Sequence, residues 1–387
     1  MALPLLKKCR VGDKLANLPV EILMEILLVL TAKDLQNLKS VSEFWNSFIS
    51  NPDFIKTQHA QSQQHILFET VALPTKRNPK FQYGQFGVNM KSKVMDLNFP
   101  QNRKALTVKA CCDGLVLFQD RYAPKQLYIS NPVTAQFQPL PLSTFICSDW
   151  ALVYDTRIQK YKVFAIHCWV IYTHLTLGEG SPSWLWYGES HEKPTATNLL
   201  SNVVLINKEL HWLTIDEDSD HRLFFFVYSI HVEEYNKFRK TRAPLAKPPD
   251  PVRLDFMKRK GQHLLSDVNG SLCFTYVTHN QLRMFVLEDR DRSLWTNSYT
   301  VHLQSLSKHF SLFGTFLSDD MCLVAVGGAG RSDLSDVIKV LVHVEDTLFF
   351  YDLKSLEKTF VGFMSKERKL SRDYFFHSES LISWSAS

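Results

Sequence analysis

The N-terminal segment has the apolar spacing of helices. Nine residues from Ile22 to Leu30, "ILMEILLVL", include eight apolar side chains and one acid, Glu25. A helix that packs on one side of a core buries a single apolar stripe, whereas this segment is apolar nearly all round. It therefore predicts a helix with two apolar faces.

Three short helices are predicted up to Ser50. Asn17 is a candidate N-cap for the first, which is predicted to run through Leu30. Thr31 begins the second helix and Ser42 the third, because Ser, Thr and Asn side chains accept hydrogen bonds from the first free N–H groups. Asn51-Pro52 then ends the third helix and begins a short fourth turn. About half of this unit is apolar, more than three helices enclose, so part of its surface must contact something else.

From about position 67 the pattern changes to short apolar runs that alternate with turn residues, which is typical of an all-β domain of antiparallel strands. Eleven such runs begin at Gly114, Gln126, Trp150, Tyr161, Asn202, Glu209, His221, Gly270, Gln281, Met321 and Asp346. A loose repeat of about 40 to 50 residues predicts a degenerate β-propeller of six to eight blades. A β-sandwich of two sheets with long loops is the alternative.

The predicted organisation is multidomain, α plus all-β. Residues 1–14 are expected to be a disordered N-terminus, 15–58 the helical unit, 59–66 a connector and 67–387 the β-domain. The connector has no glycine and no charge block, so it predicts a semi-rigid connection, with Phe54 and Ile55 packed at the junction and residues 65–69 entering the first strand.

Composition narrows the function classes. With 44 basic and 39 acidic residues the net charge is +5, too small for a dedicated nucleic-acid-binding protein. The first ten residues lack the order of a secretory signal, and every apolar run falls short of the ~18 residues that cross a bilayer. Seven cysteines without a C-x-x-C pair predict buried thiols in the cytoplasm or nucleus, not disulfides or a zinc site.

Catalytic motifs are not found. The sequence has no H-E-x-x-H, no G-x-S-x-G and no G-x-G-x-x-G ahead of a helix. The segment "VGGAGRSD" at Val326 lacks the lysine of a phosphate-binding loop, and the acidic strings "DEDSD" and "EDRD" are typical of solvated turns. No catalytic residue, cofactor or metal site is predicted, and the protein is not expected to be an enzyme.

One charge run is a candidate binding patch. Between Lys237 and Lys260 nine residues are basic and two acidic, and four prolines predict a long exposed loop. A solvated loop is the simpler interpretation. The functional one is a dock for an acidic or phosphorylated target, because Arg and Lys bind phosphate oxygens. Its candidate target-binding residues are Lys237, Arg239, Lys240 and Arg242.

The N-terminal pattern resembles a known family. The order Leu18-Pro19, Ile26-Leu27, Leu30, Leu35, Val41, Trp45, Ile49 and Phe54 is similar to the F-box, a helical module that binds the Skp adaptor of Skp/cullin/F-box (SCF) ubiquitin ligases. Thr31, Ser42-Glu43 and Asn46 depart from residues common in plant members. The resemblance implies adaptor contacts at Leu18, Pro19, Ile22, Leu35, Val41 and Trp45.

A second resemblance lies in the β-region. The strings "NPVTAQFQPLP" from Asn131 and "YDTRIQKYKV" from Tyr154 are similar to the F-box-associated domain of plant F-box proteins. Together the two resemblances imply a substrate-recognition subunit of an SCF ubiquitin ligase, which binds the Skp adaptor, through it a cullin, and an unknown target protein, with no nucleic-acid or membrane partner. The alternatives are a propeller-type enzyme or lectin, or a nucleic-acid-binding factor.

Overall fold

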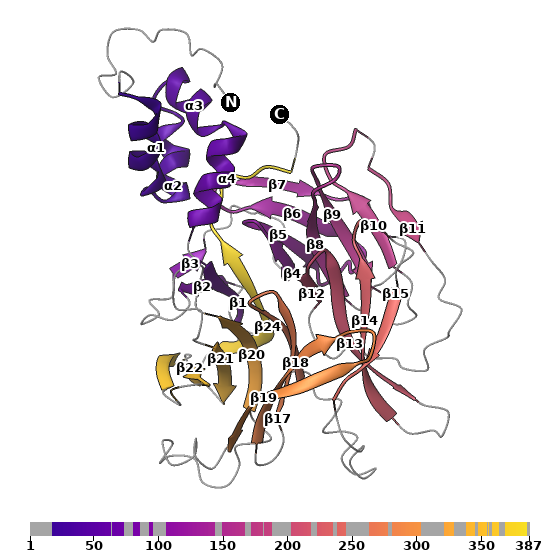
Figure 1. The fold of residues 1–387 in the computed structure, drawn as a ribbon. Helices are drawn as coiled ribbons and strands as arrows, with labels where there is room; N and C mark the ends of the chain where they lie inside the picture. Colours follow the sequence, from indigo (N-terminus) through magenta and orange to yellow (C-terminus); the bar gives the residue numbers. More distant parts are fainter. Residues whose placement is uncertain are drawn as a thin grey trace.

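The structure is a computed structural model that places four helices and 24 strands among the residues it describes (Figure 1). The described residues are 18–62, 64–72, 80–85, 93–95, 106–143, 149–166, 172–180, 182–187, 203–217, 223–234, 238–244, 263–277, 281–302, 321–328, 338–344, 347–353, 355, 358–363 and 368–384.

Four helices form the N-terminal unit: α1 (Val20–Leu28), α2 (Ala32–Leu38), α3 (Glu43–Ile49) and α4 (Pro52–Gln61). A complete fourth helix therefore replaces the short turn that the sequence predicted, and the prediction of a three-helix unit is wrong. The Asn51 side chain explains the difference, since it accepts hydrogen bonds from the N–H groups of Asp53 at 2.8 Å and Phe54 at 3.4 Å. Pro52 occupies the first turn, where a missing N–H costs nothing.

The caps of the two middle helices confirm the sequence prediction. Thr31 Oγ1 accepts the Asp34 N–H at 3.2 Å, and Ser42 Oγ accepts the Trp45 N–H at 3.3 Å. Helix α1 begins after Pro19 without a side-chain cap and ends at Leu28, two residues before the predicted end. Its predicted cap, Asn17, lies outside the described residues.

The connector between the helices and the sheets is short. Helix α4 extends to Gln61 and the first strand begins at Gln64, so most of the predicted connector, residues 59–66, is helix or strand. Phe54 is buried and Ile55 half-buried in the helical core. The prediction that both residues pack at the junction, and that residues 65–69 enter a strand, is confirmed.

The strands form six four-stranded sheets among the described residues, and every pair of neighbouring strands is antiparallel. The first sheet has β1 (Gln64–Ala72), β2 (Lys80–Gln85), β3 (Lys93–Met95) and β24 (Arg368–Ser378), and the second has β4 (Leu106–Cys112), β5 (Leu115–Asp120), β6 (Leu127–Asn131) and β7 (Gln136–Pro139). The third has β8 (Asp149–Asp155), β9 (Lys160–Ile166), β10 (Tyr172–Thr176) and β11 (Leu185–Tyr187), and the fourth has β12 (Val204–Ile206), β13 (Glu209–Glu217), β14 (Leu223–His231) and β15 (Phe238–Arg242). The fifth has β16 (His263–Val268), β17 (Ser271–Val277), β18 (Gln281–Asp289) and β19 (Leu294–His302), and the sixth has β20 (Met321–Gly328), β21 (Ile338–Val344), β22 (Thr347–Asp352) and β23 (Lys358–Phe363). The first sheet thus pairs the last strand of the chain with its first strand.

All eleven predicted runs are strands, but the predicted loop from Lys237 to Lys260 begins as one. Residues Phe238–Arg242 form β15, which pairs with β14 at the edge of its sheet. The loop prediction is therefore wrong at this end. The four prolines that predicted a loop all come after Arg242, and an edge strand tolerates charged side chains because one of its sides has no strand neighbour.

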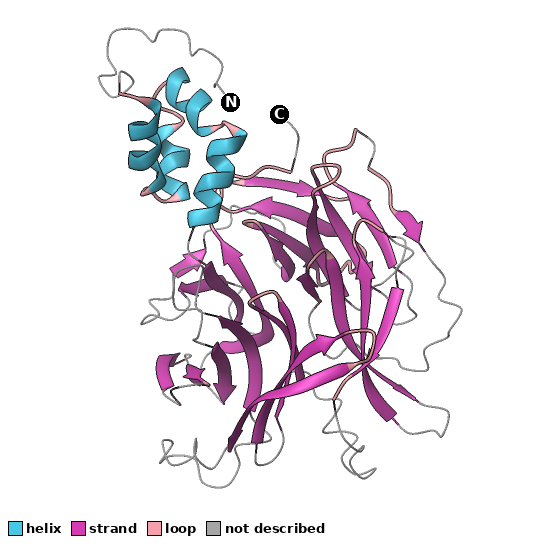
Figure 2. Ribbon diagram, viewed as in Figure 1, coloured by secondary structure: helices cyan, strands magenta, loops and turns pink. Residues whose placement is uncertain are grey.

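Hydrophobic cores lie between successive sheets. Leu117 of the second sheet shares a cluster with Val163 of the third, Phe164 of the third with Trp212 of the fourth, and a further cluster joins Phe274 of the fifth sheet to the fourth. A two-sheet sandwich would instead have one core between two sheets. Figure 2 shows the sheets following one another, with the helices at one end.

Turn chemistry explains the repeated sequence strings. In three hairpins the side-chain oxygen of an Asn or Asp accepts hydrogen bonds from the backbone N–H groups two and three residues later. The residue four positions after that Asn or Asp has a positive φ of 51° to 56°. These turns begin at Asn131, Asp155 and Asp289. Asp113-Gly114 and Asn269-Gly270 also have positive φ angles, as two-residue hairpins require.

Candidate functional site

Helix α1 has two apolar faces. Leu23 and Leu27 are each 2% exposed and belong to the core that the four helices share. Ile22, Ile26 and Val29 are 43%, 44% and 81% exposed, and their spacing of four and three residues places them in one stripe. In Figure 1 α4 is the helix nearest the sheets, while α1 lies on the outer side of the helical unit. The stripe is therefore the second apolar face that the sequence predicted.

The structure separates the six predicted adaptor-contact residues into two groups. Pro19, Ile22 and Val41 are exposed, and Leu18 is half-buried. Leu35 and Trp45 are 0% and 3% exposed, inside the helical core. Ile26 and Val29 are exposed beside Ile22 but were not among the predicted contacts, although their spacing from Ile22 is visible in the sequence.

The C-terminal segment, residues 379–384, joins the helices to the β-domain. The Leu381 side chain is 3% exposed and packs within the helical core. The buried Asn131 amide donates hydrogen bonds to the carbonyls of Ser380 at 3.1 Å and Ile382 at 2.7 Å. Trp384 Nε1 donates to Gln138 Oε1 at 2.9 Å. The chain end is thus held by both parts of the molecule, which the sequence analysis did not predict.

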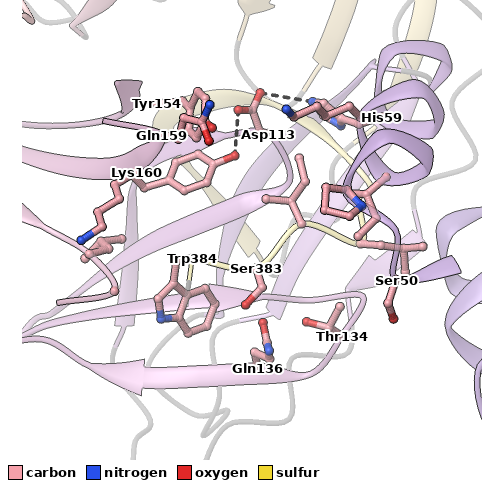
Figure 3. Close-up of a pocket in the computed structure, with 18 of the residues that line it drawn as sticks. Ser50, His59, Asp113, Thr134, Gln136, Tyr154, Gln159, Lys160, Ser383 and Trp384 are labelled. Carbon is pink, nitrogen blue, oxygen red and sulfur yellow. Dashed lines mark hydrogen bonds and ion pairs between the residues drawn. The ribbon is translucent and has the colours of Figure 1, made fainter. Parts of the chain in front are cut away.

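Asp113, in the turn between β4 and β5, is the polar centre of the junction (Figure 3). Its carboxylate accepts a hydrogen bond from the Tyr161 hydroxyl at 3.0 Å and lies 3.2 Å from Nε2 of His59 on α4. Burial favours a higher pKa for Asp113, but the hydrogen bonds and charge of His59 and the Tyr161 hydrogen bond outweigh it and lower the pKa. Burial raises the pKa of Tyr161, so its hydroxyl is a donor.

The turn around Asp113 also contacts the C-terminal segment. The Ser380 hydroxyl donates to the Asp113 carbonyl at 2.5 Å, and the His377 ring lies 3.2 Å from the Gly114 carbonyl. Gly114 has a φ of +82°, and a Cβ atom there would lie 2.7 Å from the Ser378 carbonyl oxygen. Glycine is therefore required here for its conformation and for close approach of the chain end.

A cleft of about 760 Å³ opens beside Asp113. Figure 3 shows that its walls come from the helices, the C-terminal segment and the turns of the second and third sheets. Its lining includes Gln36, Lys39, Ile55, Lys56 and His59 from the helices; Leu381, Ile382, Ser383 and Trp384 from the chain end; and Asp113, Thr134, Gln136, Tyr154, Lys160, Tyr161 and Leu177 from the β-domain.

The predicted target-binding residues that the structure describes are not part of the lining of this cleft. Arg239, Lys240 and Arg242 are exposed on β15, and Lys237 lies outside the described residues. The Lys240 ammonium lies 4.3 Å from the Phe226 ring centroid, a cation–π distance. Arg239 lies 3.4 Å from Asp291 in a solvent-exposed ion pair.

The described residues show neither a metal site nor a cysteine activated as a nucleophile. No group of three or more His, Cys, Asp and Glu side chains there is placed to hold a metal ion. Cys111, Cys112 and Cys273 are free thiols, and burial raises the pKa of each, that of Cys273 to about 12. Burial also lowers the pKa of His263 to about 4, so its ring is neutral at pH 7.

None of the helices in the described part of the chain is long and apolar enough to cross a membrane.

Comparison with known proteins identifies both parts of the chain. Residues 15–60 match the F-box-like family model, and residues 57–377 match the model of the F-box associated beta propeller domain. A putative F-box protein of Arabidopsis thaliana is 25% identical over 301 residues, which cover 73% of this chain and 71% of that protein. An F-box protein of the same plant is 24% identical over 359 residues, covering 82% of this chain and 81% of that protein.

Among solved structures, TolB from Acinetobacter baumannii is 8% identical and covers 87% of this chain and 73% of its own, with a TM-score of 0.46. That score is too low to establish a shared fold.

Proposed function

Because this chain belongs to the family of F-box proteins with an F-box associated beta propeller domain, we propose that it is the substrate-recognition subunit of an SCF ubiquitin ligase. In this role the helices bind a Skp-family adaptor, and through it a cullin, while the β-domain binds a target protein. The protein needs no catalytic group of its own, since holding a target near the ubiquitin donor raises its effective concentration.

The observation that carries the proposal is the exposed stripe formed by Ile22 and Ile26 of α1 with Val29, the residue that caps its end. Apolar side chains that lie together on an outer surface are typical of a protein–protein interface. We propose that the adaptor covers this stripe together with Pro19 and Val41. Leu35 and Trp45, which the sequence analysis also assigned to the contact, would support it from within the helical core.

Adaptor capture tests the proposal. Full burial of an Ile or Val side chain contributes about 1.5 to 3 kcal/mol, and a carboxylate in an apolar contact adds a desolvation cost. We expect Ile22→Asp with Val29→Asp to weaken binding of purified Skp adaptor at least 100-fold in surface plasmon resonance. Leu142→Asp is the matched control, since Leu142 is 64% exposed on the β-domain. Undiminished capture by the double variant would refute the assignment.

We also propose that the six sheets are the blades of a six-bladed propeller. Supporting this, β4 contacts both β24 and β8, while β20 contacts both β16 and β24, which is the order expected of the inner strands of a propeller. Pairing of β24 with β1 would join the two ends of the propeller ring. A chain that ends before Arg368 is then expected to unfold at a lower urea concentration in all six sheets, whereas independent sheets would lose only the sheet that contains β1.

For the target, we propose that loops and strand edges of the β-domain provide the binding surface, with the basic edge of β15 as one candidate. Arg and Lys there suit an acidic or phosphorylated segment. Replacing Lys237, Arg239, Lys240 and Arg242 by Ser is expected to lower target recruitment in proximity labelling without changing adaptor capture. Equal recruitment would place the surface elsewhere.

We also propose a cytoplasmic or nuclear location. The free thiols of Cys111, Cys112 and Cys273 support it, because thiols stay reduced in these compartments.

A further inference from the structure

The cleft at the junction of the helices and the β-domain has the dimensions of a small-molecule site. Its volume of about 760 Å³ falls within the roughly 300 to 1,000 Å³ of ligand pockets. Ile55, Leu177, Leu381, Ile382 and Trp384 supply apolar side chains to its lining. Such walls suit a ligand with an aromatic or aliphatic body.

Charge in the lining favours an anion. Three lysines line the cleft, Lys39, Lys56 and Lys160, against one acid, Asp113. Asp113 already has His59 and Tyr161 as partners. Neither Lys39 nor Lys56 has a carboxylate partner among the described residues, whereas Lys160 lies 3.8 Å from the exposed Glu179.

Partial burial makes the charge of Lys39 more sensitive to a nearby anion. Lys39 is half-buried at the end of α2, and burial lowers the pKa of its ammonium group. A cation that has lost part of its hydration gains most from a nearby anion, because the local dielectric constant is low.

Hydrogen-bonding groups in the lining lack partners. Gln36 Oε1, Thr134 Oγ1 and Gln136 Oε1 are buried and have no hydrogen-bond partner among the described residues. Buried polar groups are nearly always paired, so three such atoms around one cleft are unusual. These three atoms have almost no exposed surface, so their side chains have to turn toward the cleft before the threonine hydroxyl can donate to a carboxylate and the amide oxygens can accept from a hydroxyl or N–H. Thr134 and Gln136 lie across the close-up from Asp113 (Figure 3).

We propose that this cleft binds a small organic carboxylate with an aromatic body that also carries a hydroxyl or N–H group. Lys39 and Lys56 attract the carboxylate, the apolar side chains enclose the ring, and the unpaired amide oxygens accept from the ligand's donor once their side chains turn toward the cleft. The ligand contacts the helices, the C-terminal segment and the β-domain at once, so its binding stabilises their relative orientation. This site is independent of the adaptor surface on α1.

Direct binding to the full chain tests the proposal, with 6-hydroxy-2-naphthoate as the probe and its uncharged amide, 6-hydroxy-2-naphthamide, as the matched ligand. In isothermal titration calorimetry we expect the acid to bind at least tenfold more tightly than the amide. Lys39→Gln with Lys56→Gln removes that preference. Lys33→Gln, which changes an exposed lysine of α2 outside the lining, leaves it unchanged.

A second variant tests the location without changing charge. Ser383 lines the cleft with an exposed side chain, and Ser383→Phe is expected to fill the space and abolish binding of the acid. Failure of the wild-type chain to bind the acid at millimolar concentration, equal affinity for acid and amide, or unchanged binding by Ser383→Phe would each overturn the proposal. Adaptor capture by the same preparations reports separately on the SCF role.

Discussion

Leu381 offers a direct test of how the chain end holds the helices. Its side chain is 3% exposed and lies in the same core as Leu23, Leu27 and Trp45, although it comes from the far end of the chain. Leu381→Ala removes most of that side chain without touching the hydrogen bonds that the segment makes through its backbone. A cavity is left between the helices and the C-terminal segment.

The expected cost follows from the size of the cavity and the small size of the helical unit. A buried Leu→Ala change typically costs about 2 to 5 kcal/mol. A unit of roughly 40 residues has about 2 to 6 kcal/mol of stability in total. The substitution is therefore expected to let the helices open while the sheets stay folded.

Hydrogen exchange measured by mass spectrometry can locate this effect. A loss of about 2 to 5 kcal/mol corresponds to exchange that is about 30-fold to 4,000-fold faster in α1 to α4, because each 1.4 kcal/mol is a factor of ten. Peptides from β8 and β9 should exchange as in the wild-type chain. Leu142→Ala, at a 64% exposed leucine, is the control and should change stability by less than about 0.5 kcal/mol. Wild-type exchange rates in the helices of Leu381→Ala would refute this account of the junction.

Three further predictions concern the β-domain. Gly114→Ala should lower the urea midpoint more than Gly270→Ala: their φ angles are +82° and +80°, which costs an L-residue about 1 to 2 kcal/mol, but only the first also meets the C-terminal segment. Equal losses would contradict the close approach. Lys162→Met should cost about 3 to 5 kcal/mol in urea unfolding, since it leaves the buried Asp155 carboxylate without the ammonium group 2.6 Å away; a loss below 1 kcal/mol would contradict this. Asp113→Asn should lose most stability at neutral pH: the folded pKa of Asp113 is lowered, so its stabilising effect is present above its unfolded pKa and disappears as the pH falls through the folded value. A difference in thermal midpoint that does not shrink below pH 4 would refute this.

Features that depend on neighbouring residues could be predicted from the sequence. Thr31 and Ser42 cap their helices because the N–H groups they accept lie three residues away, whatever the remaining chain does. The Asp113-Gly114 turn is local in the same sense. Strand-forming runs were equally readable, since alternation and β-branched residues act over a few positions. The second apolar face of α1 also followed from the sequence, because apolar residues occupy nearly every position from Ile22 to Leu30.

Contacts between distant residues were decided only by the tertiary structure. Which apolar residues of each helix face inward depends on how the four helices pack together, so the buried Leu35 of α2 and Trp45 of α3 could not be separated from the exposed Ile22 of α1 by spacing. Prolines further along the segment suggested a loop that includes Arg239, but pairing with β14 made this part a strand. Asn131 and Ile382, whose carbonyl accepts a hydrogen bond from the Asn131 amide, are 251 positions apart, and no local pattern links them. Their contact, and the cleft beside it, exist because the last strand returns to the first and carries the chain end against the helices.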